Sequence, residues 1–428
     1  MMSDYLMALW AGGGNVPPQL VIAKRLVRAG HEVRILAPSV LKDAVIATGA
    51  TFEPYWKAPE HDTGNPELDL MKDWEVAGLA AAARVRDRLM IGTAAAFCSD
   101  LLELIERQRP NALVVDYALF GGFLAGERAA LPTIGLIHSI YPFPAPGIPA
   151  FGLGLLPARG LPGALRDRFL TYFVARFWNR PLPNLNAVRG EFGLPALSSV
   201  LEFFERSTRL LVLTSASFDF TGTLPANVRY VGIQVDPDSS PVRRESHLRG
   251  TPPIVLVGFS TTYQKQQVLL HRVIEALGSL DVIGKVTLGP IPVSAVGAVT
   301  SNVQLHEWVD HNVLLPEVDL VVTHAGHGTV ATALRHGVPV VCLPMGRDQK
   351  DVAIRAVTRR AGVMASPKLS ARSIARVIER ALHDQSLRDG AQRLADLFAA
   401  DDPTAAVTEL QAAVAEQTSY VERVAMRR

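Results

Sequence analysis

The stretch YLMALWAGGGNVPPQLVIAKRLVRAGHEVRILA, residues 5–37, decides the fold class. An apolar run at residues 5–10 is followed by a glycine cluster at residues 12–14. Apolar side chains then recur at helical spacing over residues 17–28, Gly30 ends the helix, and residues 31–37 return to a strand pattern. Strand, glycine turn, helix and strand make a βαβ unit, which predicts a parallel sheet in an α/β protein.

The same alternation continues along the chain. The predicted elements are helices at 101–107, 121–130, 264–277, 328–336, 350–360 and 371–382, and strands at 112–116, 133–138, 210–214, 228–233, 254–258, 285–289, 303–307, 320–323, 338–343 and 363. Residues 235–253 change to Asp, Ser, Pro, Arg and His without apolar periodicity, which is typical of a linker. We therefore predict domains at 1–235 and 253–404, separated by a linker at 236–252 and followed by a C-terminal segment at 405–428. Two such domains leave a cleft at the carboxyl ends of their strands, where ligands bind.

Composition narrows the class of protein. Of the 428 residues 48% are hydrophobic, and 43 Lys and Arg against 41 Asp and Glu leave a net charge of +2. This balance argues against a nucleic-acid partner, and no apolar run is long enough to predict a transmembrane helix. Residues 1–10 lack the basic start of a signal peptide, and two distant cysteines, Cys98 and Cys342, exclude a disulfide framework. We expect a cytoplasmic monomer or homodimer without stable membrane insertion.

The most informative motif is the hexapeptide HAGHGT, residues 324–329, which lies between an apolar run and a predicted helix. Its two glycines let a ligand approach the backbone, and a helix start carries about half a positive charge. A diphosphate suits such a turn, because Thr329 can donate its hydroxyl and His324 can bond a phosphate oxygen when protonated or through a ring N–H. Taken alone, the motif is equally consistent with a plain strand-to-helix turn capped by threonine.

The flanking residues make this motif more specific. WVDH at 308–311 lies upstream, and LPMGRDQ at 343–349 lies downstream. At this spacing, residues 304–349 resemble the signature of GT-B glycosyltransferases, most closely the nucleotide-sugar-dependent family that glycosylates macrolides and other natural products. The resemblance covers most of the chain. It implies two Rossmann-like parallel-sheet domains facing across a cleft, with the acceptor site in the first, the donor site in the second and a final helix that returns to the first.

The resemblance also implies a donor site. The aromatic ring of the WVDH segment would lie beside the nucleobase and the following backbone would pair with a base edge, although an aromatic packed beside a strand is the alternative. The HAGHGT turn and the polar turn at 260–262 would hold the diphosphate. The Asp-Gln pair that ends LPMGRDQ would bind sugar hydroxyls. The alternative interpretation of this pair is an ordinary helix start with acidic capping. The residues so assigned are Ser260, Thr261, Trp308, Val309, His324, Gly326, Gly328, Thr329, Asp348 and Gln349. Thr332 stands near the place of a glutamate that often binds ribose in UDP-sugar users, so UDP and dTDP both stay open.

The first glycine turn departs from the family pattern. Many relatives carry Gly-His there, and that histidine takes the acceptor proton, whereas this chain has Asn15. An amide can orient a hydroxyl but cannot accept its proton. Asp116 matches the aspartate that orients the histidine in relatives, and His138 ends the next strand. Three alternatives follow. Asp116 is the base, directly or through a water, or His138 is the base. In the third, the acceptor is acidic enough, with a pKa of ~10, to need little help.

Other segments of the chain carry weaker signals. Residues 12–14 lack the third glycine of a dinucleotide fingerprint, which argues against NAD. The D-x-D pattern at 236–238 stands among linker residues, which favours a turn over a metal site. The proline- and glycine-rich tract at 141–163 and the arginine-bearing segment 164–178 form either a surface excursion with an amphipathic helix, an adaptable wall for a bulky apolar ligand, or a weak membrane-surface patch.

The resemblance thus implies an inverting, metal-independent glycosyltransferase without a cofactor. Its co-substrate would be a UDP- or dTDP-sugar, and its acceptor a hydroxyl of a hydrophobic small molecule. Two alternatives remain: a nucleotide-sugar epimerase or phosphorylase of the same fold, and a non-catalytic partner that binds the donor or activates another transferase.

Overall fold

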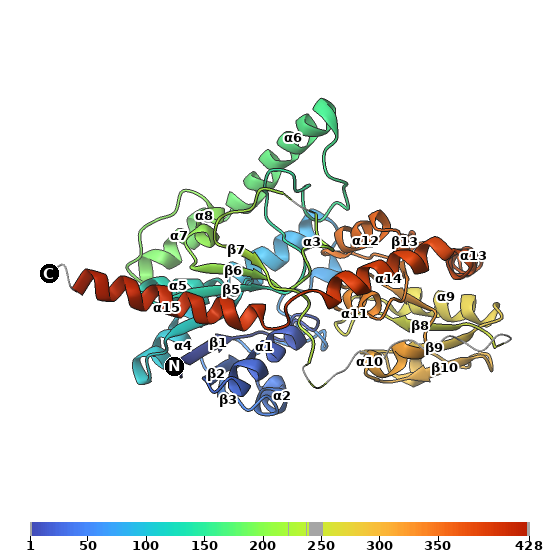
Figure 1. Ribbon diagram of the computed structural model, residues 1–428, viewed down its shortest axis with the longest axis horizontal. Coiled ribbons are helices and arrows are strands. Elements are labelled where there is room, and N and C mark those ends of the chain that lie inside the picture. The colour runs from blue at the N-terminus through green and yellow to red at the C-terminus, as the bar shows by residue number, and fades with distance from the viewer. Residues whose placement is uncertain (1, 221, 237, 239–250, 426–428) are drawn as a thin grey trace.

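The computed structural model describes residues 2–220, 222–236, 238 and 251–425, with side chains up to residue 417. Its strands form two parallel sheets, one of seven strands ordered β3-β2-β1-β4-β5-β6-β7 and one of six ordered β10-β9-β8-β11-β12-β13. The predicted pair of Rossmann-like parallel sheets is therefore confirmed, and Figure 1 shows the two sheets side by side along the long axis. Most of the predicted linker at 236–252, and residues 426–428, lie outside the described residues.

The first sheet carries helices on both faces. Along β1, Leu6 enters the core shared with α4 and α5, whereas Tyr5 and Met7 enter the core shared with α1, because successive strand side chains point to opposite faces. Its strands are β1 (Asp4–Ala8), β2 (Glu32–Ala37), β3 (Thr51–Pro54), β4 (Ala112–Asp116), β5 (Thr133–Ile137), β6 (Arg209–Val212) and β7 (Val228–Tyr230). Its helices are α1 (Val16–Arg28), α2 (Lys42–Ile46), α3 (Leu79–Arg84), α4 (Ala94–Arg107), α5 (Phe120–Ala129), α6 (Gly160–Asn179), α7 (Leu182–Glu191) and α8 (Val200–Glu205).

The second sheet is covered in the same way. Val255 and Val257 of β8 pack with α9 and α13, while Leu256 packs on the opposite face with α11, α12 and α14. Its strands are β8 (Ile254–Gly258), β9 (Ile283–Thr287), β10 (Val303–His306), β11 (Leu320–Thr323), β12 (Val340–Cys342) and β13 (Gly362–Met364). Its helices are α9 (Gln267–Gly278), α10 (His311–Leu314), α11 (His327–Arg335), α12 (Gln349–Thr358), α13 (Ala371–His383) and α14 (Gln385–Ala399).

The last helix, α15 (Ala405–Ala425), lies on the first domain (Figure 1). Ala406 and Leu410 join the core of α1 and β1, and Glu409 forms an ion pair with Arg209 at 3.3 Å. Among the described residues, no helix has both the length and the apolar character needed to span a membrane.

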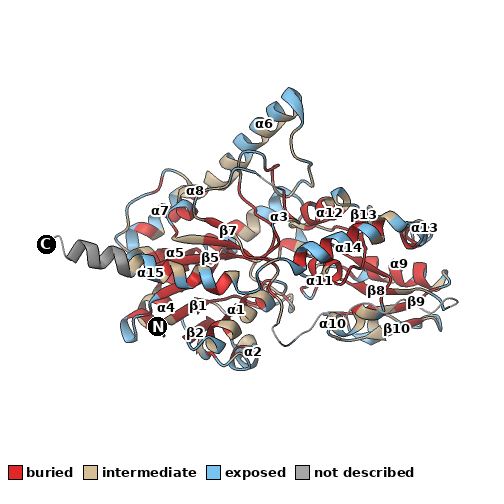
Figure 2. Ribbon diagram, in the orientation of Figure 1, coloured by how far each residue is buried: buried red, intermediate tan, exposed pale blue. Residues whose placement is uncertain are grey.

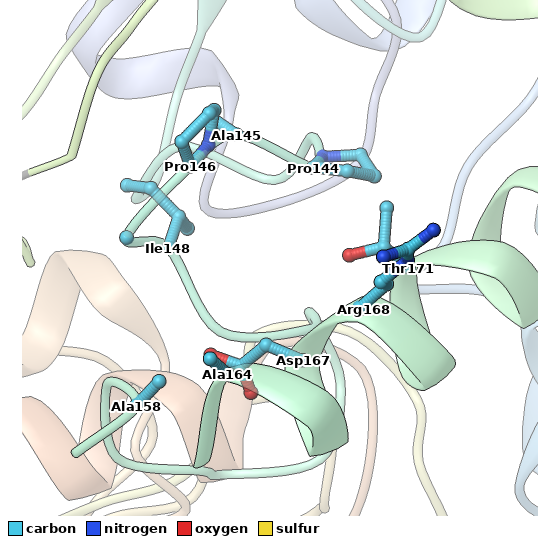
Figure 3. A pocket seen from close by; sticks show the side chains of 10 residues that line it. Pro144, Ala145, Pro146, Ile148, Ala158, Ala164, Asp167, Arg168 and Thr171 are labelled. Atoms are coloured by element: carbon cyan, nitrogen blue, oxygen red, sulfur yellow. The ribbon is translucent and has the colours of Figure 1, made fainter. Parts of the chain in front are cut away.

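Helix α6 projects from the body of the first domain (Figure 1), and none of its residues is buried. Figure 2 colours it as intermediate and exposed. Leu161 is 81% and Phe169 63% accessible. Between its first half and the loop at 144–148 lies a cavity of about 410 Å³ (Figure 3). Prolines, alanines and Ile148 form most of its lining, with Asp167 and Arg168 at the helix side.

Candidate active site

The carboxyl end of β4 places a carboxylate on the predicted acceptor side. Asp116 is fully buried. Its Oδ2 accepts hydrogen bonds from Asn15 Nδ2 at 2.9 Å and Gln19 Nε2 at 2.5 Å, and its Oδ1 accepts from the Ala118 amide at 2.9 Å. Asn15 also donates to the Trp10 carbonyl at 3.0 Å, so its amide joins the glycine turn to the aspartate.

His138 completes this cluster. It follows β5 directly, and its Nδ1 lies 3.3 Å from Asp116 Oδ2, within ion-pair distance but without hydrogen-bond geometry. Burial alone would raise the pKa of Asp116, but the neighbouring His138 and the hydrogen bonds from the Ala118 amide and Asn15 outweigh it, so the pKa lies below its ordinary value. Asp116 is therefore an ionised, weakly basic group, whereas the His138 side chain is 20% exposed. The structure thus brings together Asn15, Asp116 and His138.

The predicted diphosphate turn lies where β11 meets α11. Gly326 is the N-cap of α11, and a Cβ there would lie 2.6 Å from His324 Nε2, so the close approach of the ring requires glycine. A Cβ at Gly328 would meet nothing within 4 Å, which leaves open space above the helix start. The first backbone N–H groups of a helix have no intrahelical partner. In the part of the chain that the structure describes, the Thr329 hydroxyl makes no hydrogen bond.

Both histidines of this turn are neutral near pH 7. Burial lowers the pKa of His324 to about 4, against the raising effect of Asp348. Burial likewise lowers the pKa of His327 to about 4, and its Nε2 lies 2.8 Å from Thr214 Oγ1 of the first domain. His324 can therefore serve a phosphate through a ring N–H rather than through a positive charge.

Asp348 and Gln349, at the start of α12, make different contacts. Asp348 occupies the N-cap position but its side chain makes no cap hydrogen bond. Instead its Oδ2 accepts a hydrogen bond of 2.6 Å from Ser139 Oγ, the residue after His138. Gln349 is buried, accepts from the Met345 and Gly346 amides and donates to Gln264 at 2.9 Å, so in this structure it holds the loop.

The remaining predicted residues lie on two loops. Trp308 is 79% exposed on the connection between β10 and α10, which excludes the alternative of a buried core aromatic, and Val309 is half-buried beside it. Ser260 is buried and its Oγ lies 2.7 Å from Thr262 Oγ1. Thr261 is exposed, and a Cβ at Gly13, where φ is +81°, would lie 2.8 Å from its Oγ1. The polar turn thus abuts the first glycine turn.

Contacts between the domains involve residues that the sequence analysis did not assign. Ser139 bridges to Asp348, and Arg347 forms a two-pronged ion pair with Asp73 at 2.9 Å for each prong. Arg347 lies inside the LPMGRDQ segment, where a positive charge beside the Asp-Gln pair could have marked it as a functional residue. Nothing in the local pattern of Ser139 or Asp73 marks either residue, because their partners are 209 and 274 positions away.

Comparison with known proteins adds to this geometry. The family described as "Erythromycin biosynthesis protein CIII-like, C-terminal domain" matches residues 271–413. The chain is 34% identical over 424 residues to 4'-demethylrebeccamycin synthase of Lentzea aerocolonigenes, covering 96% of this chain and 99% of that protein. The chain belongs to the natural-product glycosyltransferases.

Solved structures agree on the fold of this glycosyltransferase. The calicheamicin glycosyltransferase CalG4 superposes with a TM-score of 0.74 at 20% identity, covering 97% of this chain and 98% of that one. The glycosyltransferase VinC in complex with DTDP superposes with a TM-score of 0.70 at 18% identity, covering 96% and 100%. These likenesses confirm the predicted GT-B arrangement of the glycosyltransferase.

Proposed function

We propose that this glycosyltransferase moves a sugar from UDP or dTDP to a hydroxyl of a hydrophobic small molecule, with inversion and without a metal. The hydrogen bond of 2.6 Å from Ser139 to Asp348 carries the proposal. It joins the residue beside the candidate base to the residue expected to bind the donor sugar. An acceptor held at His138 would therefore lie next to a sugar held at Asp348, which is the proximity that group transfer needs.

His138 is the base that the contacts favour. The Asp116 carboxylate already accepts from three N–H groups and has a lowered pKa, so it is a poor proton acceptor. Its charge lies 3.3 Å from His138 Nδ1 and would stabilise the imidazolium formed when Nε2 takes the acceptor proton. Asn15 and Gln19 then hold the carboxylate in place, and His138, directly after β5, would take the role of the histidine that the glycine turn lacks.

The second domain would bind the donor. The diphosphate would lie over the start of α11, where His324 and Thr329 donate to its oxygens and Gly328 leaves room. The exposed Trp308 would stack on the nucleobase, and Val309 would pair with its edge. Ser260 and Thr261 would face the phosphates, and Asp348 with Gln349 would contact the sugar once Gln349 exchanges partners. VinC in complex with DTDP supports a dTDP-sugar as one candidate donor.

The acceptor would lie between this site and the excursion after His138. The loop that follows Ser139 leads to the apolar cavity beside α6. Its Gly152 and Gly154 amides donate to Asp351 of α12, at 2.6 and 3.2 Å. The segment after His138 thus begins beside the candidate base and is hydrogen-bonded further along to the donor domain. A segment held in this way could form one side of a site for a bulky apolar acceptor. Cys98 and Cys342 are free and buried, which fits a reducing cytoplasm.

The test is product analysis. The protein is incubated with UDP-glucose or dTDP-sugars and a panel of phenolic and macrocyclic acceptors, and products are identified by mass spectrometry and by the anomeric configuration. Glycosides of inverted configuration, formed in the presence of a chelator, support the proposal. Asp348→Ala should lower turnover by ~10²-fold or more, the scale of lost transition-state contacts, while Asp384→Ala, at the exposed N-cap of α14, should not. Retained configuration, a chelator effect or donor consumption without acceptor would contradict it.

A further inference from the structure

Arg347 is held in an unusual backbone conformation beside the donor turn. Its φ is +52°, in the left-handed region that a residue with a side chain occupies at a cost. The side chain explains why this conformation persists: Nε and one terminal nitrogen donate to the two oxygens of Asp73, each at 2.9 Å, and the other terminal nitrogen donates to Thr262 Oγ1 at 3.3 Å. The guanidinium is thus fixed against the polar turn at 260–262.

A bound diphosphate would bring negative charge to this turn, and few positive charges lie there to balance it. The nearby His324 is neutral, since burial lowers its pKa to about 4. The start of α11 supplies only partial charge. For Arg347, burial alone would lower the pKa, but Asp73 outweighs it, so the guanidinium stays positive. The bond from Arg347 to Thr262 places this cation at the polar turn that would face the phosphates.

Asp73 belongs to a segment that reaches across to the second domain. The Tyr263 amide donates to the Thr63 carbonyl at 2.8 Å, and the Trp74 and Tyr263 rings meet edge to face with centroids 4.9 Å apart. The fork that Arg347 offers to this carboxylate has the same planar, two-pronged geometry that binds a phosphate. A donor diphosphate can therefore take the place of Asp73 as the partner of the arginine.

We propose that Arg347 is the counter-charge of the donor's diphosphate, and that Asp73 keeps it in position while the donor is absent. This inference rests on the proposed function and adds a residue to it. When the bond between the anomeric carbon and the diphosphate oxygen breaks, its electron pair stays on that oxygen, and the acceptor oxygen forms the new bond. Arg347 would donate hydrogen bonds to the departing diphosphate as its charge increases, which lowers the barrier.

A purely structural role makes a different prediction. If the Arg347–Asp73 pair served only to join the domains, removing either partner would have the same effect. If Arg347 serves the diphosphate, removing it weakens binding, whereas Asp73→Asn releases the arginine from a competing carboxylate. The two variants then move in opposite directions, so one comparison separates the two roles.

The experiment measures the affinity of the full-length protein for UDP, dTDP, uridine and thymidine by calorimetry, with Arg347→Gln, Arg347→Lys and Asp73→Asn. Arg347→Gln should weaken nucleoside diphosphate binding by about tenfold or more, the scale of a lost charged hydrogen bond, and leave nucleoside binding unchanged. Arg347→Lys, which keeps the charge without the fork, should fall between. Asp73→Asn should bind the diphosphates as well as or better than the wild type.

Other outcomes overturn the proposal in distinguishable ways. Equal weakening by Arg347→Gln and Asp73→Asn would show a domain contact only, and unchanged affinity in Arg347→Gln would show that the arginine does not meet the diphosphate. Both results leave the proposed function standing, because the wild type still binds UDP or dTDP. A wild type that binds neither nucleotide would overturn the proposed function together with this inference. Thermal unfolding shows whether each variant is folded. If Arg347→Gln does not fold, Arg347→Lys still tests the two-pronged contact, because it keeps the charge.

Discussion

Replacing Asp116 by asparagine tests the buried cluster in two separable ways. Asp116 Oδ2 accepts from Asn15 and Gln19, and Oδ1 accepts from the Ala118 amide. An asparagine has one oxygen, so in either orientation its NH₂ group faces an N–H donor. At least one buried donor is left unpaired, which costs about 1–3 kcal/mol of the free energy of unfolding.

The same substitution should lower turnover for a different reason. Asp116→Asn removes the charge that lies 3.3 Å from His138 Nδ1, and the imidazolium of a histidine base depends on such a charge. General-base catalysis contributes typically ~10²–10⁴-fold, so kcat should fall by at least about 10²-fold. His138→Gln should lose a similar factor. The double variant should be little worse than either single one, since residues that act as a unit are not additive.

The assays are urea unfolding and initial rates at saturating donor, with Asp100→Asn as the matched control. Asp100 is also fully buried and accepts amide hydrogen bonds on both oxygens, from Lys57 at 3.0 Å and Ala58 at 3.0 Å. It should lose comparable stability and keep its kcat. Full activity in His138→Gln, with activity lost in Asp116→Asn, would make Asp116 the base. Full activity in both would leave acceptor acidity as the explanation and refute the reasoning.

Three further predictions concern the donor side. Trp308→Ala should leave the free energy of unfolding unchanged, because the ring is 79% exposed, but weaken UDP and dTDP binding by about 1–3 kcal/mol of lost base stacking; unchanged affinity in calorimetry would contradict this. Gly326→Ala should displace the His324 ring, since the new Cβ would lie 2.6 Å from its Nε2. Gly326→Ala and Gly328→Ala should both weaken nucleotide binding. Gly328→Ala should keep the thermal stability of the wild type, because nothing lies within 4 Å of its Cβ. His324 has an ordinary pKa near 6.5 in the unfolded chain and a pKa of about 4 in the folded one, so protons bind the unfolded chain preferentially. The free energy of unfolding should therefore decrease as the pH is lowered from 6.5 to 4. In urea titrations His324→Gln should flatten this pH dependence, whereas the exposed control His383→Gln should not.

Much of the sheet architecture could be predicted from the sequence. The strands expected at 112–116, 254–258 and 320–323 have the bounds found for β4, β8 and β11. Strands buried on both faces of a parallel sheet are continuous apolar runs, and their carboxyl ends mark the site. Asp116 and the turn from 324 to 329 therefore fell where parallel topology places ligand-binding residues.

Other elements and contacts could not be predicted. The edge strand β3 is short and only partly buried, and α7 has no clear apolar face. Neither was predicted from the sequence, nor were α8 and α14. Helix α9 begins at Gln267 rather than at residue 264, because Gln264 and Gln266 bond within the polar turn. The pairing of Ser139 with Asp348 depends on how two domains meet, and no local periodicity encodes it.

The most direct test of the account is the crystal structure of the protein with dTDP or UDP bound. The account predicts the diphosphate over the start of α11, within hydrogen-bond distance of the Gly328 and Thr329 amides and the His324 side chain. A nucleotide bound elsewhere in the chain, with that turn left free, would contradict it.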